Sequence, residues 1–305
     1  MTWTKPNKEY THYQHELQRV AAAWFKARDY RVDHNYPSRL ADPRERYLNI
    51  IDPAVFDYVK AEKQARKPLG EGLAINKQLH SGLDSQALLF NLVAPLIMQD
   101  DLAPLQAAFT AQGLPWPDGA TAYLAYANRK VLNEHDDSPT SIDLVIKDAA
   151  GAPQLFIDVK LAESDFGGCP SINDADCYSM RPLNEFDNCC LNYNRQRGFA
   201  TRLAELGFFP DPVTPEEECL LAQHFCFFRQ LCFTLALDGS FVLLHDARNP
   251  VFTGDTSLLA YLTQFVPARY HAQIYSITIQ QVVQAIKDSG RHPWINEFEQ
   301  KYGMG

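Results

Sequence analysis

The segment from residue 141 to 163 places charged side chains inside two short apolar runs, and this pattern constrains the fold more than any other feature of the chain. In each run, apolar residues alternate with other residues, which is typical of half-buried β-strands. The sequence DAAGAP between the runs supplies turn residues. The pattern therefore predicts a β-hairpin that carries Asp143 on its first strand and Asp158 and Lys160 at the end of its second.

These three side chains form a group with a defined chemistry. Strand side chains alternate between faces, so Asp158 and Lys160 should project to one side, and an antiparallel partner can bring Asp143 beside them. The two carboxylates and the backbone carbonyl of Val159 are suitable ligands for Mg²⁺, with Mn²⁺ as an alternative. The Lys160 ammonium could orient an attacking water and stabilise charge that develops on a phosphate. The group predicts metal-assisted phosphodiester hydrolysis.

The spacing of the three residues resembles the PD-(D/E)xK nuclease superfamily, which includes many restriction endonucleases and RecB-like nucleases. Asp143 corresponds to the first acid of the motif, and Asp158 and Lys160 to the (D/E)xK element, although Ile142 stands where the motif has Pro. The resemblance implies an α/β fold with a restriction-endonuclease-like core, in which a central mixed β-sheet is flanked by helices. It also implies a Mg²⁺-dependent endonuclease that acts on DNA in restriction or defence.

A helix before the hairpin extends this resemblance. The sequence LDSQALLFNLVAPL is similar to a helix that precedes the catalytic hairpin in one branch of restriction-endonuclease-like proteins. Many superfamily members carry an acid there, whereas this chain has Gln86, which can hydrogen-bond a metal-bound water but supplies no charge. Gln86 is thus a candidate catalytic residue. Alternatively, Gln86 and Asn91 are buried amides that bind neighbouring backbone.

The remaining elements are predicted from hydrophobic periodicity and from capping residues. We expect an N-terminal helical appendage, residues 1–80, and a nuclease-like domain, residues 81–305. Asp84 or Ser85 should be the N-cap of the helix before the hairpin, Pro95 should bend or end its first segment, and Thr278 should be the N-cap of a C-terminal helix. The expected elements are helices in 15–32, 55–66, 81–112 and 216–237, strands in 122–131 and 241–247, and a short strand before Thr278.

Four of the seven cysteines follow the hairpin, at Cys169, Cys177, Cys189 and Cys190. Some RecB-like nucleases carry a cysteine-ligated iron–sulfur cluster, but these spacings do not match CxxC pairs, which disfavours a zinc or iron–sulfur site. Buried or incidental thiols are the preferred interpretation. A cysteine-coordinated metalloprotein with incidental hairpin acids is one alternative function, and a non-catalytic nuclease-fold module that binds nucleic acid or protein is another.

The net charge of −9 argues against a general nucleic-acid coat, although basic residues could still gather on one face. No apolar run of about 18 residues is present and the amino terminus lacks the apolar segment of a signal peptide, so we expect a cytoplasmic protein without membrane contact.

DNA is the expected partner, and a homodimer would suit the cutting of two strands. Residues considered for auxiliary roles or phosphate contacts are His135, Asp136, Asp137, Gln223 and Arg229, together with Arg39, Arg44, Arg46, Tyr47, Lys60, Lys63, Arg66 and Lys67.

Overall fold

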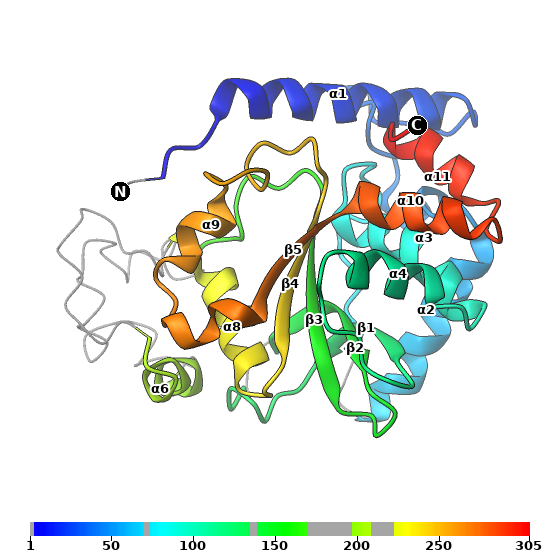
Figure 1. Ribbon diagram of the computed structural model, residues 1–305. Coiled ribbons are helices and arrows are strands. Elements are labelled where there is room, and N and C mark those ends of the chain that lie inside the picture. The colour runs from blue at the N-terminus through cyan, green and yellow to red at the C-terminus, as the bar shows by residue number, and fades with distance from the viewer. Residues whose placement is uncertain (1–2, 70–72, 135–138, 170–196, 209–222) are drawn as a thin grey trace.

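A mixed five-stranded sheet lies at the centre of the computed structural model, which describes residues 3–69, 73–134, 139–169, 197–208 and 223–305 (Figure 1). The strands follow the order β1-β2-β3-β4-β5. β1, β2 and β3 pair antiparallel, whereas β3, β4 and β5 pair parallel. The strand bounds are β1 (Thr121–Ala127), β2 (Ser141–Lys147), β3 (Pro153–Lys160), β4 (Ser240–His245) and β5 (Ile274–Thr278).

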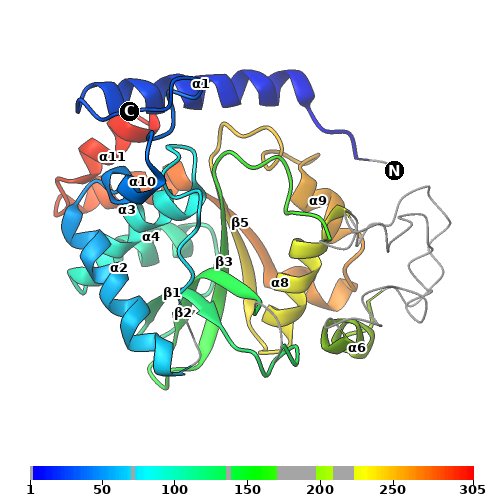
Figure 2. The ribbon, with the colours of Figure 1, turned by 180° about the vertical axis from the view of Figure 1, so that it is seen from behind.

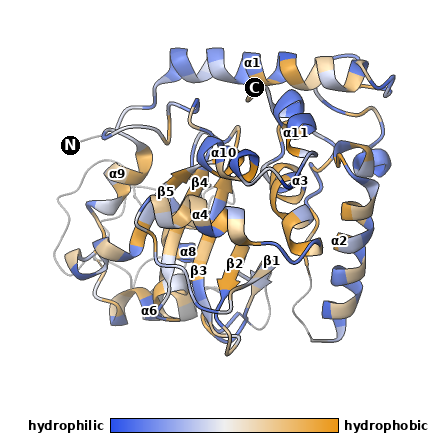
Figure 3. Cartoon of the chain, turned by 45° about the vertical axis from the view of Figure 1, so that its right-hand side comes forward, coloured by the Kyte–Doolittle hydropathy of each residue, from blue (hydrophilic) through white to orange (hydrophobic). Residues whose placement is uncertain are grey.

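Helices flank this sheet, as the sequence predicts. Figures 1 and 2, which view the molecule from opposite sides, show α8 over one face and α4 and α10 toward the other. In Figure 3 the strands are mostly apolar, while the surrounding helices carry both polar and apolar residues. The helices are α1 (Asn7–Lys26), α2 (Pro53–Arg66), α3 (Ser85–Met98), α4 (Ala103–Ala111), α6 (Arg197–Glu205), α8 (Phe225–Leu235), α9 (Leu258–Thr263), α10 (Ile279–Ser289) and α11 (Ile295–Tyr302), with 3-10 turns η1 (Pro43–Asn49), η2 (Lys67–Leu69) and η5 (Ala268–Gln273).

The predicted hairpin is confirmed as β2 and β3. The Asp148 side chain shapes its turn, because Oδ1 accepts hydrogen bonds from the backbone N–H groups of Ala150 and Ala152, both at 2.9 Å. Gly151 adopts a positive φ of 80°, which glycine tolerates without steric cost. Every residue of β3 from Leu155 to Lys160 is buried, so the strand that carries the DxK sequence runs through the core.

The helix that precedes the hairpin begins as predicted but does not end at Pro95. The Asp84 side chain is the N-cap and accepts a hydrogen bond from the backbone N–H of Ala87 at 2.8 Å. Pro95 does not end α3, which continues to Met98, and the predicted helix 81–112 divides after Met98 into α3 and α4. Proline costs one backbone hydrogen bond, but the helix is buried from Ala87 through Leu96, and this apolar burial outweighs the loss.

Other predicted elements are confirmed with shifted ends. β1 ends at Ala127 instead of Val131, because the chain turns where the Val131 N–H donates to the Asn128 carbonyl at 3.2 Å. Thr278 caps α10 in a capping box with Gln281. Within the described residues, the predicted helix 216–237 is present as α8, and residues 209–222 lie outside them.

One core cluster includes residues on both sides of the expected domain boundary, from Tyr10 of α1 to Tyr302 of α11. The division into residues 1–80 and 81–305 remains a prediction. Among the described helices, none is both long and apolar enough to cross a membrane.

The entry into β4 depends on a glycine. A Cβ atom at Gly239 would lie 2.2 Å from Phe156 Cε2 and 3.1 Å from the Gln154 carbonyl oxygen. We expect Gly239→Ala to lower the free energy of unfolding by about 2–3 kcal/mol, since it would push the aromatic ring on β3 out of place. Urea unfolding measures this loss. Gly113→Ala is the control, because Gly113 has a φ of 74° but open space around its Cβ position. It should cost about 1 kcal/mol through backbone strain alone, and equal losses in the two variants would contradict the packing argument.

Candidate active site

Side chains on one face of β3 pack against side chains of α8. Phe156, Asp158 and Lys160 share one face of β3 because strand side chains alternate. The Phe156 ring packs against Phe233 of α8, with ring centroids 6.0 Å apart. Gln230 lies one helical turn before Phe233, and its Nε2 donates to Asp158 Oδ1 at 3.2 Å. An aromatic pair and a polar pair therefore lie side by side in the same interface between strand and helix.

Asp143 lies where the backbone pairing on both sides of β2 is interrupted. On the β1 side it faces Ala125, which has a φ of 49° and is skipped by the strand pairing. On the β3 side the pairing ends at Leu144 and Ile157. There the Asp143 carboxylate serves as the hydrogen-bond acceptor in place of a backbone carbonyl. Its Oδ2 accepts a hydrogen bond from the Val159 N–H at 2.9 Å. The two hairpin acids are thus held at the same level of the sheet.

Lys160 and Asp158 form a buried ion pair. Lys160 Nζ lies 3.0 Å from Asp158 Oδ1 and 2.9 Å from Oδ2, but only the contact with Oδ1 has hydrogen-bond geometry. Asp158 Oδ2 is therefore buried without a hydrogen-bond donor, and so is Gln230 Oε1. A buried acceptor oxygen without a donor is costly unless something else neutralises it. Asp158 is only 1% exposed and Lys160 9%.

The pKa values of these groups reflect their burial and their proximity. Burial, and then the charge of Asp158, raise the pKa of Asp143 to about 7, against the opposing effects of Lys160 and of the Val159 N–H. Burial lowers the pKa of the Lys160 ammonium, but the carboxylates of Asp158, Glu163 and Asp143 outweigh it, and the net change is upward. Lys160 therefore keeps its positive charge at neutral pH.

Two residues near the site had no assigned role in the sequence analysis. Glu163 accepts a hydrogen bond from the Leu161 N–H at 2.7 Å, and its charge raises the pKa of both Asp143 and Asp84. The second residue without an assigned role is Gln230, which donates to Asp158. Glu163 lies in a turn, where strand alternation gives no signal, and Gln230 lies on a helix that is apolar on most of its surface. Neither side chain could have been located from spacing alone.

Gln86 and Asn91 bind backbone groups. Gln86 Oε1 accepts from the Asn76 N–H at 2.7 Å, and its Nε2 donates to the Ala74 carbonyl at 2.8 Å. Asn91 Oδ1 accepts from the Ile51 N–H at 2.7 Å. These contacts correspond to the alternative in which both amides bind neighbouring backbone. A catalytic role for Gln86 stays a prediction.

The auxiliary candidates have varied surroundings. Arg229 is partly buried and forms an ion pair with the buried Glu134, while Gln223 is exposed. Arg66 is buried beside Glu62 and donates to the Leu124 carbonyl. Arg44 pairs with Asp42, and Lys60 with Asp57. Among all candidates the structure does not describe His135, Asp136, Asp137, Cys177, Cys189 and Cys190, whereas Cys169 is described and buried.

No group of three or more His, Cys, Asp or Glu side chains is arranged to hold a metal ion in the part of the chain that the structure describes. The hairpin offers two carboxylates, Asp143 and Asp158. Mg²⁺ is commonly bound by one or two carboxylates, with waters and substrate phosphates completing its shell. The described acids are therefore too few for a site made of protein carboxylates alone but sufficient for a Mg²⁺ site of this kind.

A mixed sheet flanked by helices places the chain in the class of restriction-endonuclease-like folds. The chain belongs to the family described as Restriction Endonuclease associating with ARP, which it matches over residues 17–303. No curated protein and no solved structure matches it. The family relationship supports a restriction-type nuclease.

The raised pKa of Asp143 predicts a dependence of stability on pH. Its pKa of about 7 in the folded protein exceeds the ordinary 3.8, so ionisation of Asp143 should cost stability as pH rises from about 4 to about 7, and no more beyond that. Asp143→Asn cannot ionise, yet it keeps an oxygen for the Val159 N–H. In chelator, we expect this variant to melt above the wild type at pH 8, with a smaller difference at pH 5.

Thermal unfolding at the two pH values tests this prediction. Asp57→Asn is the matched control, because the Asp57 side chain is 73% exposed. Removal of its charge should not reproduce the rise in melting temperature at pH 8. A difference between Asp143→Asn and the wild type that stays constant with pH would show that Asp143 does not titrate as described.

Proposed function

We propose that this chain is a Mg²⁺-dependent DNA endonuclease of the PD-(D/E)xK type that acts in restriction or defence. The observation that carries the proposal is the convergence of Asp143, Asp158 and Lys160 in a chain of a restriction-endonuclease family. The sheet pairing supports it, because the strand with Asp158 pairs parallel with β4, and the acids lie near the carboxyl ends of these strands. Ligand sites of α/β sheets commonly lie at that end.

The donor set suits a hard cation. Asp143 and Asp158 would hold Mg²⁺, or Mn²⁺, together with the backbone carbonyl of Val159. Asp158 Oδ2 is buried and has an ionic contact with Lys160 Nζ at 2.9 Å but no hydrogen bond, which supports this assignment. The Val159 carbonyl points to the same side of β3 as its N–H, which contacts Asp143, since both groups of a strand residue point to one neighbour. Bound Mg²⁺ would polarise the phosphate and lower the pKa of a coordinated water.

The other side chains have separate tasks in this proposal. Lys160 remains an ammonium, so it orients the attacking water and stabilises negative charge on the phosphate, and it does not remove a proton. Its ion pair with Asp158 fixes the position of its Nζ atom. Gln230 Nε2 donates to the same oxygen, Asp158 Oδ1, at 3.2 Å, and this second hydrogen bond limits the rotation of the carboxylate. Both contacts lie in the part of β3 that is buried, so charges interact strongly there.

Removal of the lysine charge tests catalysis. Lys160→Met keeps most of the side-chain volume and removes the ammonium, so cleavage of DNA should fall by roughly 100-fold or more. The assay uses plasmid and single-stranded DNA with Mg²⁺, Mn²⁺ or chelator. Lys147→Met is the control, because Lys147 lies at the other end of the same hairpin. Cleavage by Lys160→Met at the wild-type rate would refute the site assignment.

Metal binding can be measured without turnover. The melting temperature of the wild type should rise with Mg²⁺ concentration, since a ligand that binds only the folded state stabilises it. Asp158→Asn should lose this rise, because it removes a ligand charge without changing side-chain shape. Asp148→Asn changes an acid in the hairpin turn and should keep it. An equal Mg²⁺-dependent rise in Asp158→Asn and the wild type would place the metal elsewhere.

The family description also associates these endonucleases with ARP. We extend this association to the present chain as part of the proposal, and the cleavage assay is therefore run with and without added ARP. Cleavage that requires ARP would support a joint activity. Absence of cleavage on every substrate, with either metal and with ARP, would overturn the endonuclease proposal in favour of a non-catalytic nuclease-fold module.

A further inference from the structure

The turn that follows Lys160 is held by a helix from the other end of the chain. The Tyr13 hydroxyl donates to the Leu161 carbonyl at 2.7 Å, and the Tyr10 hydroxyl donates to the Ala162 carbonyl at 2.6 Å. Both tyrosines are buried and lie three residues apart on one face of α1. Figure 1 shows α1 passing over the loops that follow β3 and β4. The chain segment directly after the DxK sequence is therefore bound to a helix 148 residues away in sequence.

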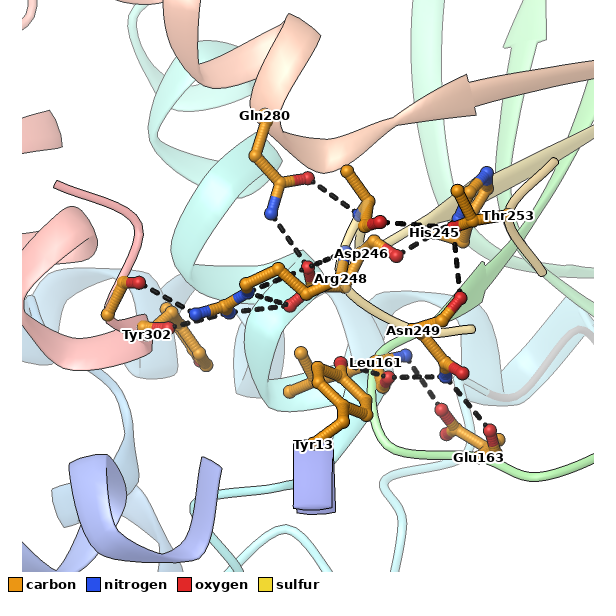
Figure 4. A network of polar contacts seen from close by, with 12 residues as sticks. Tyr13, Leu161, Glu163, His245, Asp246, Arg248, Asn249, Thr253, Gln280 and Tyr302 are labelled. Atoms are coloured by element: carbon orange, nitrogen blue, oxygen red, sulfur yellow. Dashed lines mark hydrogen bonds and ion pairs between the residues drawn. The ribbon is translucent and has the colours of Figure 1, made fainter. Parts of the chain in front are cut away.

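Asn249 holds the same turn from the opposite direction. Its side chain is fully buried, and Nδ2 donates to the carbonyls of Leu161 and Glu163, both at 3.0 Å (Figure 4). Its Oδ1 accepts from the Val251 N–H at 3.1 Å. All three hydrogen bonds of this amide are thus directed to fixed backbone groups. The Leu161 carbonyl accepts one bond from α1 and one from the loop after β4, so both of its lone pairs are used.

The loop that carries Asn249 is itself anchored by a buried ion pair. Asp246 is fully buried and accepts from Arg248 Nη2 at 2.6 Å and from Gln280 Nε2 at 2.7 Å. The Arg248 guanidinium also donates to the Tyr302 carbonyl at 2.9 Å and so joins this loop to the end of α11 (Figure 4). The Asn249 N–H donates to the Asp246 carbonyl at 2.9 Å. The amide is therefore presented to the turn by a rigid support.

We propose that Tyr13 and Asn249 are positioning residues for the turn at residues 161–163, which follows Lys160. They hold this turn by binding the Leu161 carbonyl from two sides. This inference rests on the proposed nuclease function. Leu161 lies beyond the last residue of β3, so side-chain hydrogen bonds replace strand pairing at this point. Lys160 precedes the fixed carbonyl directly, and Glu163, anchored on the Leu161 N–H, places its charge near Lys160 and Asp143. A displacement of about 1 Å at such groups can cost about 100-fold in rate.

Substitutions that remove these hydrogen bonds test this role. Tyr13→Phe keeps the ring and its packing, and we expect kcat for DNA cleavage to fall about 10-fold with KM unchanged. Asn249→Ala removes both bonds to the turn and should lower kcat further, again without a change in KM. The double variant should lose less than the product of the two single effects, because both residues act on one carbonyl.

Tyr302→Phe is the matched control. It also removes a buried tyrosine hydroxyl that takes part in a hydrogen bond, from Asn91 Nδ2 at 2.9 Å, while the backbone carbonyl that Arg248 binds is retained. It should lose stability comparably in urea unfolding and keep the wild-type kcat. A fall in kcat in Tyr302→Phe equal to that in Tyr13→Phe would show a general structural effect and overturn the positioning role.

Failure of this inference can be separated from failure of the nuclease proposal. If the wild type cleaves DNA and both Tyr13→Phe and Asn249→Ala retain its kcat, the positioning role is wrong and the endonuclease proposal stands. If the wild type cleaves no DNA under any condition, including added ARP, both are overturned. A rise in KM with unchanged kcat would also contradict the inference, since it would place these residues in DNA binding.

Discussion

The charged group at the end of β3 is the constraint on which the rest of the structure depends. Asp158 and Lys160 lie in the part of β3 that is buried, from Leu155 to Lys160, where an unpaired charge would be strongly unfavourable. Their ion pair satisfies only part of this requirement, since Asp158 Oδ2 has the ionic contact with Lys160 Nζ but no hydrogen bond. The pKa of Asp143 is raised first by burial and then by the charge of Asp158, and the opposing effect of Lys160 does not cancel these two causes. The fold therefore holds an electrostatically unfavourable arrangement that a cation would relieve.

The surrounding elements stabilise this arrangement by packing and by hydrogen bonds to backbone. On one face, the Phe156–Phe233 pair fixes the register of α8 against β3, and this register places Gln230 beside Asp158. At the strand end, α1 and the loop after β4 hold the turn through its carbonyl groups. Aromatic packing and uncharged hydrogen bonds supply the rigidity, while the charged groups remain incompletely neutralised. On the proposed function, this division would keep the charged groups in place before a cation binds between them.

Local patterns predicted much of the fold, whereas the completeness of the site depends on tertiary packing. The hairpin and its three charged residues follow from strand alternation, and the N-caps Asp84 and Thr278 follow from side-chain chemistry next to helix starts. Gln230 could not be distinguished from Gln223 or Arg229, because α8 is apolar on most of its surface and no polar stripe marks the face that meets β3. The support of the turn could not be predicted either, since it joins segments far apart in the chain.

The charge of the site also constrains the order of binding in the proposed reaction. Asp158, Glu163 and, above its pKa, Asp143 surround one ammonium group, so the site without metal is negative and repels a phosphate. The described basic residues offer limited compensation nearby, since Arg229 is already paired with Glu134. A divalent cation would reverse the sign of the field at this position. On the proposed function, cation binding must therefore precede or accompany the approach of the scissile phosphate, and Lys160 alone cannot attract it.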